Sequence, residues 1–145
     1  MEFWDIYDAD KKPTGRTMKR NDWCLKDGEY HLTVLGVVAR PDKTFLITKR
    51  VMTKAWAPGW WEVSGGAAQA GEGSREAVLR EVKEETGYTL TSYRFCGIVT
   101  FVSGNGVTEY MHLFTADGFE GEPIACDEGE LEWVDIDKIE SLHIW

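Results

Sequence analysis

The segment from Ser74 to Thr86 has a helical period and constrains the fold of this chain more than any other stretch. Val78 and Val82, four residues apart, begin an apolar stripe, so one face of the helix is expected to pack on a core. Ser74 is expected to cap the helix and Gly87 to end it. Because β-branched, apolar segments precede and follow this helix, the sequence predicts an α/β fold with a mixed sheet.

Three glutamates are expected to lie on one side of this helix. At about 100° per residue, Glu81, Glu84 and Glu85 share an arc of about 100° beside the apolar stripe. Glutamates three and four positions apart repel one another, and Lys83 falls on the other side of the helix. Converging carboxylates predict a divalent cation, and oxygen ligands favour Mg²⁺, Mn²⁺ or Ca²⁺ over zinc. The arc alone is more typical of an acidic, solvated helix face.

Strands are expected on both sides of the helix. They cover residues 3–7, 31–39, 44–50, 60–63, 95–102, 109–116 and 131–134, and a helical turn or two follows over 135–142. Residues 31–39 are almost continuously apolar, as in a strand buried on both faces. The Ser-Gly-Asn-Gly sequence of 103–106 predicts a hairpin, and 117–129 reads as an acidic loop.

Length, charge and cysteine content limit the class of protein. The 145 residues suit one domain. Acidic residues outnumber basic ones by 25 to 16, and a net charge of −9 disfavours nucleic acid or an anionic membrane as a partner. Cys24, Cys96 and Cys126 are far apart, which predicts free thiols. With no long apolar run and no signal peptide at the start, a cytoplasmic protein is expected.

Residues 66–88 have the spacing G-x5-E-x7-R-E-U-x-E-E-x-G-U, in which U is a bulky apolar residue. This segment is identified as the signature of the Nudix hydrolases. The resemblance implies a Nudix-type α/β/α sandwich with a mixed β-sheet over residues 1–145, with an N-terminal β-hairpin extension in 1–30. It also implies metal-dependent hydrolysis of a diphosphate linkage, in a nucleoside diphosphate linked to another moiety or in a related small diphosphate. Water then attacks at phosphorus.

Carried over position by position, the resemblance makes Glu84 and Glu85 metal ligands, with Mg²⁺ or Mn²⁺ as the cofactor. Glu81 becomes either a third ligand or the base that deprotonates water, and the carbonyl of Gly65 an additional ligand. Arg80 is expected to pair with the glutamates and hold their side chains, with an ordinary surface ion pair as the alternative. Glu81, Glu84 and Arg80 are thus the expected catalytic residues.

Nudix enzymes often take one more acid from a later loop. Glu128 is the preferred candidate here, followed by Asp127 and Glu130, and then by Glu109. Each of them has a solvated surface charge as its alternative role. The sequence does not decide among these four residues.

Three further residues are expected near the substrate. Arg50, at the end of a strand, is expected to reach a phosphate, with an exposed strand-end arginine as the alternative. Among the tryptophans before the glycine pair, Trp60 is expected to stack on a base or another flat group, with core packing as the alternative. Glu72 is expected to cap or bridge the loop before the helix rather than to bind metal tightly.

The first residues, with Trp4 in a Trp-Asp-Ile-Tyr-Asp run and His31 further on, resemble the extension of Nudix proteins related to isopentenyl-diphosphate isomerase. Ser64, where many nucleotide-cleaving members have proline, fits that branch. The isomerases' cysteine-containing segment is absent here, so hydrolysis is favoured over isomerase-like activity. A non-catalytic nucleotide-sensing module is a second alternative, although such modules typically lose box glutamates. The expected partner is a small diphosphate, and a homodimer is compatible with the family.

Overall fold

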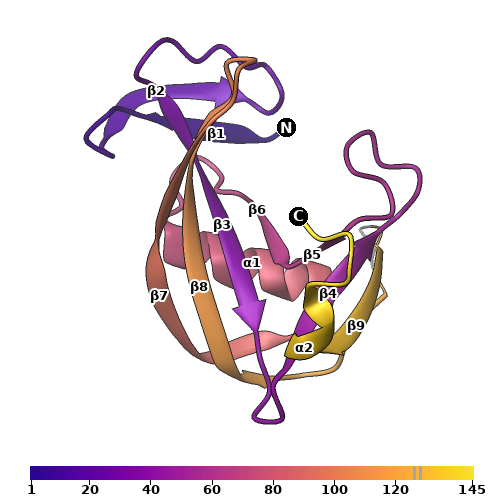
Figure 1. The fold of residues 1–145 in the computed structure, drawn as a ribbon. Helices are drawn as coiled ribbons and strands as arrows, with labels where there is room; N and C mark the ends of the chain where they lie inside the picture. Colours follow the sequence, from indigo (N-terminus) through magenta and orange to yellow (C-terminus); the bar gives the residue numbers. More distant parts are fainter. Residues whose placement is uncertain (126, 128) are drawn as a thin grey trace.

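The computed structural model describes residues 1–125, 127 and 129–145. Figure 1 shows the elements in chain order: β1 (Phe3–Tyr7), β2 (Pro13–Lys19), β3 (Tyr30–Val38), β4 (Thr44–Arg50), β5 (Trp61–Glu62), β6 (Ser64–Ala67), α1 (Ser74–Thr86), β7 (Thr89–Val102), β8 (Thr108–Glu120), β9 (Gly129–Asp135) and α2 (Ile136–Ile139). One sheet has the strand order β2-β1-β3-β8-β7, with β6 also paired to β3, and the other has the order β5-β4-β9.

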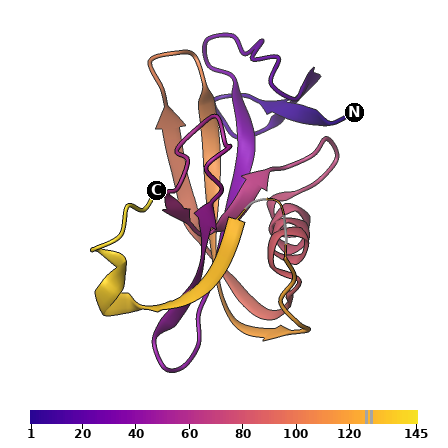
Figure 2. The same ribbon diagram turned by 90° about the vertical axis from the view of Figure 1, so that its right-hand side faces the viewer.

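The helices lie on opposite sides of the strands, as Figure 2 shows. In the larger sheet β3 and β8 run parallel, whereas β6 and β7 pair with their neighbours in antiparallel fashion. The predicted α/β/α arrangement with a mixed sheet is therefore confirmed. Within the described part of the chain, neither helix has the length and apolar character needed to cross a membrane.

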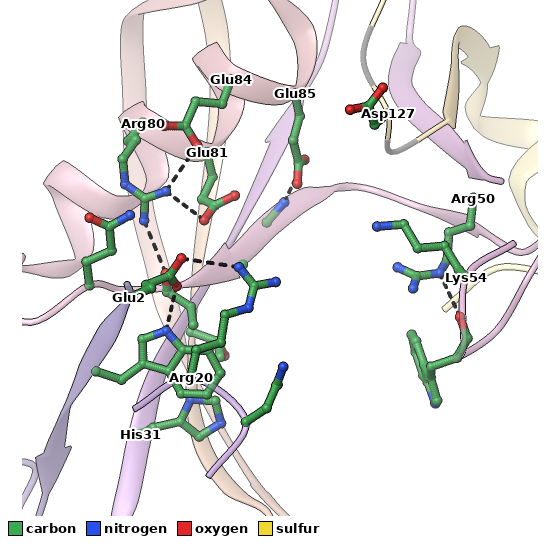
Figure 3. Close-up of a pocket in the computed structure, with 18 of the residues that line it drawn as sticks. Glu2, Arg20, His31, Arg50, Lys54, Arg80, Glu81, Glu84, Glu85 and Asp127 are labelled. Atoms are coloured by element: carbon green, nitrogen blue, oxygen red, sulfur yellow. Dashed lines mark hydrogen bonds and ion pairs between the residues drawn. The ribbon is translucent and has the colours of Figure 1, made fainter. Parts of the chain in front are cut away.

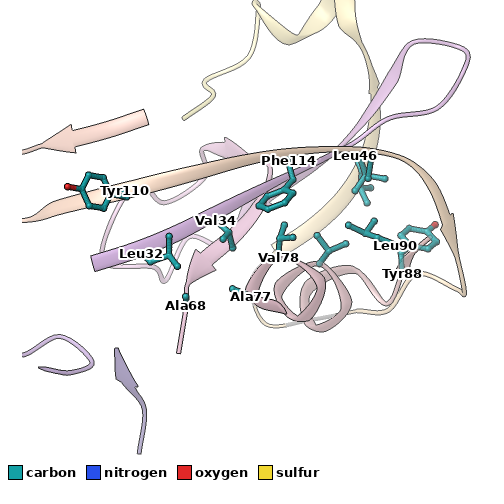
Figure 4. Close-up of a cluster of buried hydrophobic side chains, with 13 residues drawn as sticks. Leu32, Val34, Leu46, Ala68, Ala77, Val78, Tyr88, Leu90, Tyr110 and Phe114 are labelled. Atoms are coloured by element: carbon teal, nitrogen blue, oxygen red, sulfur yellow. The ribbon is translucent and has the colours of Figure 1, made fainter. Parts of the chain in front are cut away.

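The apolar stripe of α1 packs on the larger sheet, as predicted. Val78 and Val82 are fully buried in a cluster that also contains Val34 and Phe114 (Figure 4). Gly36 in β3 permits this close approach, because a Cβ atom there would lie 2.8 Å from Val82 Cγ2 and 3.0 Å from Val78 Cγ2. The glycine therefore sets how near the helix lies to the sheet.

Replacing Gly36 by Ala is expected to lower the free energy of unfolding by about 1–3 kcal/mol, the usual cost of overpacking a core. The matched control is Gly104→Ala in the β7–β8 turn, where a Cβ would meet nothing within 4 Å. That change is expected to alter stability by less than about 0.5 kcal/mol. Chemical denaturation of both variants measures the difference, and equal stabilities would contradict the close-packing explanation.

The bounds of α1 match the prediction, but its cap does not. Gly87 ends the helix with φ of 86°, and its N–H donates to the Lys83 carbonyl. The N-cap is Gly73 rather than Ser74, and no side chain caps the first turn. Glu76 instead places a negative charge in that turn, where the helix dipole is positive.

The strands differ from expectation mainly in length. β7 begins at Thr89 and β8 continues to Glu120, well into the segment expected to be loop, because the two strands pair along their whole length. The pair Gly65 and Gly66 lies inside β6 rather than ending a strand, and it pairs with β3. β3 itself alternates mostly between fully and partly buried residues instead of being buried on both faces. Pairing with distant strands decided these bounds.

The N-terminal hairpin of β1 and β2 extends the larger sheet, as Figure 1 shows. β1 pairs with the start of β3 through Ile6↔His31 and Tyr7↔Tyr30. Trp4, Ile6 and Met18 form a small core of their own beneath it. The hairpin is thereby fixed next to the first residues of β3.

The cysteines fit the expectation as far as the structure describes them. Cys24 and Cys96 are free and exposed. Cys126 lies outside the described residues.

Candidate functional site

Three walls enclose a pocket of about 690 Å³ beside α1 (Figure 3). α1 supplies an acidic wall with Glu81, Glu84 and Glu85. Arg50 and Lys54, from the end of β4 and the loop after it, lie across the pocket from these glutamates. The N-terminal segment and the start of β3 form the third wall. The fold thus brings the predicted glutamates to one cavity.

Arg80 is the centre of the acidic wall. Its guanidinium donates to Glu72 at 2.7 and 3.0 Å, to Glu81 at 2.9 Å and to Glu84 at 3.2 Å. It also donates to the Ala67 carbonyl at 3.1 Å. With 21% of its side chain exposed, Arg80 is more enclosed than the arginine of an ordinary surface ion pair. The hydrogen bond from Arg80 is the main reason why the pKa of Glu72 is lowered.

Glu72 bridges the loop before α1, as expected, but does not line the pocket. Its carboxylate accepts hydrogen bonds from the Gln69 N–H at 2.8 Å and from Arg80. Both oxygens are thereby turned toward the loop and the helix. Arg80, which Glu72 holds, lines the pocket instead.

The glycine pair of β6 brings the backbone close to the glutamates. A Cβ atom at Gly66 would lie 2.6–2.8 Å from the carboxylate atoms of Glu81. Glu85 accepts a hydrogen bond from the Gly65 N–H at 3.2 Å. Burial raises the pKa of Glu81, the charge of Glu84 adds to this effect, and Arg80 opposes it. A side chain at position 66 would force the Glu81 carboxylate to move from this position.

The donor atoms suit Mg²⁺ or Mn²⁺, because both ions prefer carboxylate and carbonyl oxygens. Among the described residues, however, no three Asp, Glu, His or Cys side chains already converge closely enough to hold an ion. Glu84 has 60% of its side chain exposed and so has room to turn toward Glu81 and Glu85. The residues fit a divalent cation in kind, with a side-chain rotation needed to complete the ligand set.

The structure separates the candidates for the later-loop acid. Asp127 lines the pocket, and Glu128, the preferred candidate, lies outside the described residues. Glu130 is exposed on β9 and lines a different, smaller cavity of about 300 Å³. Glu109 lies in the sheet beside His31, and burial raises its pKa. Of the three described candidates, Asp127 is the one in the pocket lining.

Arg50 lines the pocket as expected, but its guanidinium is already engaged. It donates to both carboxylate oxygens of Glu62, at 2.9 and 3.0 Å, and to the Trp56 carbonyl at 3.0 Å. This bonding fixes the position of its charge at the edge of the pocket. A phosphate would meet an arginine that is held in place rather than a flexible one.

Trp56, and not Trp60, is the tryptophan of this region that lines the pocket. The Trp60 ring stacks on His143, with centroids 4.7 Å apart. The C-terminal segment runs beside β5, where the Trp61 N–H donates to the His143 carbonyl at 2.8 Å, and it thereby covers Trp60. Trp60 is therefore partly buried against the C-terminal segment, outside both core clusters of the described residues.

The third wall was missed by the sequence analysis. The rings of Trp4 and His31 stack with centroids 5.0 Å apart, and Trp23 packs against both. Burial lowers the pKa of His31 to about 4, so its ring is uncharged at neutral pH. The register Ile6↔His31 brings these residues together, and no local spacing in the sequence signals it.

Comparison with known proteins shows which proteins the chain is similar to. A family model described as the NUDIX domain matches residues 29–145. The chain is 37% identical over 116 residues to an oxidized purine nucleoside triphosphate hydrolase of Danio rerio, covering 79% of this chain and 72% of that protein. It is 36% identical over 124 residues to the nucleoside triphosphatase NudI of Salmonella heidelberg, covering 78% and 86%.

A solved structure has a similar fold. The structure comes from work on MutT of Aliivibrio salmonicida and Vibrio cholerae and aligns with a TM-score of 0.67 and 28% identity, covering 78% of this chain and 86% of that one. Among the curated relatives compared, the chain spans between 53% and 86% of their length. These comparisons lend no support to the isomerase-related branch.

Proposed function

The chain belongs to the Nudix family of hydrolases, and from this premise we propose that it cleaves a diphosphate linkage in a nucleoside diphosphate linked to another moiety. The observation that carries the proposal is the acidic wall, in which Glu81, Glu84 and Glu85 line one pocket with Arg50 and Lys54 across from them. Two relatives are named as nucleoside triphosphate hydrolases, which favours nucleoside triphosphates as the first compounds to test.

The residues of the acidic wall have separate roles in this reaction. Glu84 and Glu85 would hold Mg²⁺ or Mn²⁺, and Glu81 would be a third ligand or accept the proton of the attacking water. The carbonyl of Gly65 and the carboxylate of Asp127 are the further candidate ligands. When bound, the ion would neutralise the charge of the diphosphate and lower the pKa of water.

The chemical step is a displacement at phosphorus. The water oxygen forms a bond to phosphorus as the bridging P–O bond breaks, and the leaving phosphate takes the electron pair. The proton of the water passes to a carboxylate of the acidic wall. Arg80 positions Glu81 and Glu84 for these tasks, because it binds one oxygen of each carboxylate.

The test is release of phosphate, pyrophosphate or a phosphomonoester from a panel of diphosphates, with millimolar Mg²⁺ and with chelator. The panel contains nucleoside triphosphates with normal and oxidised bases, nucleotide sugars, dinucleoside polyphosphates, NADH and isopentenyl diphosphate. We expect cleavage of at least one nucleotide, abolished by chelator. Binding without cleavage, independent of Mg²⁺, would identify a sensor instead, and isomerisation of isopentenyl diphosphate would identify an isomerase.

A further inference from the structure

The N-terminal wall of the pocket presents one accessible aromatic ring on a rigid base. Trp4 and His31 are only 5% and 3% exposed, and their rings are nearly parallel, with 15° between the planes. Trp23 packs against this pair, with centroid distances of 5.6 Å to Trp4 and 5.5 Å to His31, yet remains 43% exposed. Of the three rings, Trp23 is the one with substantial surface left for a ligand.

The backbone conformation of Trp23 supports a role for this residue in binding. Its φ of 43° lies in the left-handed region, which is costly for a bulky side chain. Contacts with Trp4 and His31 hold it there. Strained backbone that is fixed by its surroundings is concentrated at binding sites.

The charges of this wall are paired within it. Glu2 accepts a hydrogen bond from the Trp4 indole N–H at 2.7 Å and another from Arg20 at 3.2 Å. Asn21 and Thr33, which also line the pocket, are uncharged. This wall is therefore aromatic and close to neutral, in contrast to the acidic wall of α1.

His31 supplies buried polar atoms at this wall. Among the described residues, neither ring nitrogen makes a hydrogen bond, although Nε2 lies 3.4 Å from Glu109 Oε2. A buried polar atom without a hydrogen bond is costly, and a ligand or a water that bonds to it removes that cost. Both nitrogens are themselves buried, so Asn21, which is exposed and lines the pocket, is the accessible polar side chain of this wall.

The other exposed tryptophan of the pocket, Trp56, is already in contact with two groups. The Arg50 guanidinium lies 5.1 Å from its ring centroid, and Trp145 packs edge-on against it at 4.7 Å. An incoming ring would compete with these contacts. In the part of the chain that the structure describes, no Lys or Arg side chain lies over the Trp23 ring as Arg50 lies over Trp56.

We propose that the N-terminal wall is the subsite for the nucleobase of the substrate. The base stacks on Trp23, and its polar edge meets Asn21. A planar, uncharged ring with donors and acceptors on its edge suits a neutral aromatic wall. The inference rests on the proposed function, because a nucleotide whose base is held here would direct its phosphates toward the acidic wall.

The subsite belongs to a part of the chain that the family model does not include. That model begins at residue 29, so Trp4, Asn21 and Trp23 lie before it. His31 and Thr33 lie at the start of the matched region. Base recognition would thus come mainly from the N-terminal extension and the strand to which it is paired.

The experiment measures binding without metal, so that catalysis is not involved. GMP, AMP, CMP, UMP and ribose 5-phosphate are titrated in the presence of chelator, and the indole N–H signals are followed by NMR. We expect at least one nucleotide to bind about tenfold more tightly than ribose 5-phosphate, with shifts of the Trp4 and Trp23 signals. Trp23→Ala should reduce that preference at least about fivefold, in the range for loss of one stacked base, and Trp23→Phe should largely restore it.

The matched control is Phe3→Ala, which removes another aromatic residue of the N-terminal segment with similar exposure, 42%, outside this pocket. It should keep the preference for the nucleotide. Four nucleotides that bind no better than ribose 5-phosphate would overturn the proposal. So would a preference that survives Trp23→Ala but is lost in Trp56→Ala.

The two proposals fail separately. Metal-dependent hydrolysis with no base preference in the metal-free titration would remove the subsite and leave the proposed function intact. Base-selective binding without hydrolysis under any metal condition would remove the proposed function and leave the subsite intact.

Discussion

Replacing Glu84 or Glu85 by Gln is expected to lower turnover roughly 100- to 1,000-fold, the loss seen when one preorganised group is removed from a site that stabilises developing charge. Glutamine has the shape of glutamate but lacks the negative charge that draws a cation to this pocket. It can still accept the hydrogen bond from the Gly65 N–H at position 85 or from Arg80 at position 84. The fold should therefore be retained, and steady-state kinetics with saturating Mg²⁺ measures the loss.

Glu76→Gln is the matched control for these variants. Glu76 lies in the first turn of the same helix, is exposed and does not line the pocket. It should keep wild-type turnover, and all three variants should have nearly the wild-type melting temperature. Full activity in both Glu84→Gln and Glu85→Gln would refute the metal assignment.

Arg80→Lys is expected to reduce both stability and turnover, although it keeps the positive charge. A lysine has three donors on one atom and cannot serve Glu72, Glu81, Glu84 and the Ala67 carbonyl together, as the guanidinium does. We expect a loss of about 2–3 kcal/mol of unfolding free energy, since hydrogen bonds to charged groups are lost in a partly buried place.

Turnover should fall about 10- to 100-fold, the usual effect of removing a residue that positions metal ligands. The control is Arg75→Lys, an exposed arginine of the same helix. A positioning role also predicts a weaker apparent affinity for Mg²⁺, which a purely structural role would not change once folded protein is compared. Wild-type stability and Mg²⁺ dependence in Arg80→Lys would contradict this account of the acidic wall.

Features that depend on neighbours in the sequence could be predicted from it. The bounds of α1, its buried stripe and the shared side of Glu81, Glu84 and Glu85 follow from the helical period. The turn between β7 and β8 follows from its Gly and Asn residues, because these adopt the turn conformations readily. Helix and turn geometry relate residues a few positions apart, so local spacing is enough information for both.

Features that depend on strand pairing could not be predicted from the sequence. β7 and β8 continue beyond their apolar residues because each satisfies the other's backbone hydrogen bonds. Trp60 was expected in the site, but the C-terminal segment covers it and leaves Trp56 in the pocket lining.

The sequence by itself determined the acidic face of α1, because the spacing of the glutamates places them on one side of any helix formed there. Tertiary structure alone decided what that face meets: the backbone of Gly65 and Gly66, and a wall that the N-terminal hairpin builds by pairing β1 with β3. Register between β1 and β3 places Trp4 beside His31. That register depends on which side chains fill the sheet's two faces once all strands are in place, a property that no local pattern carries.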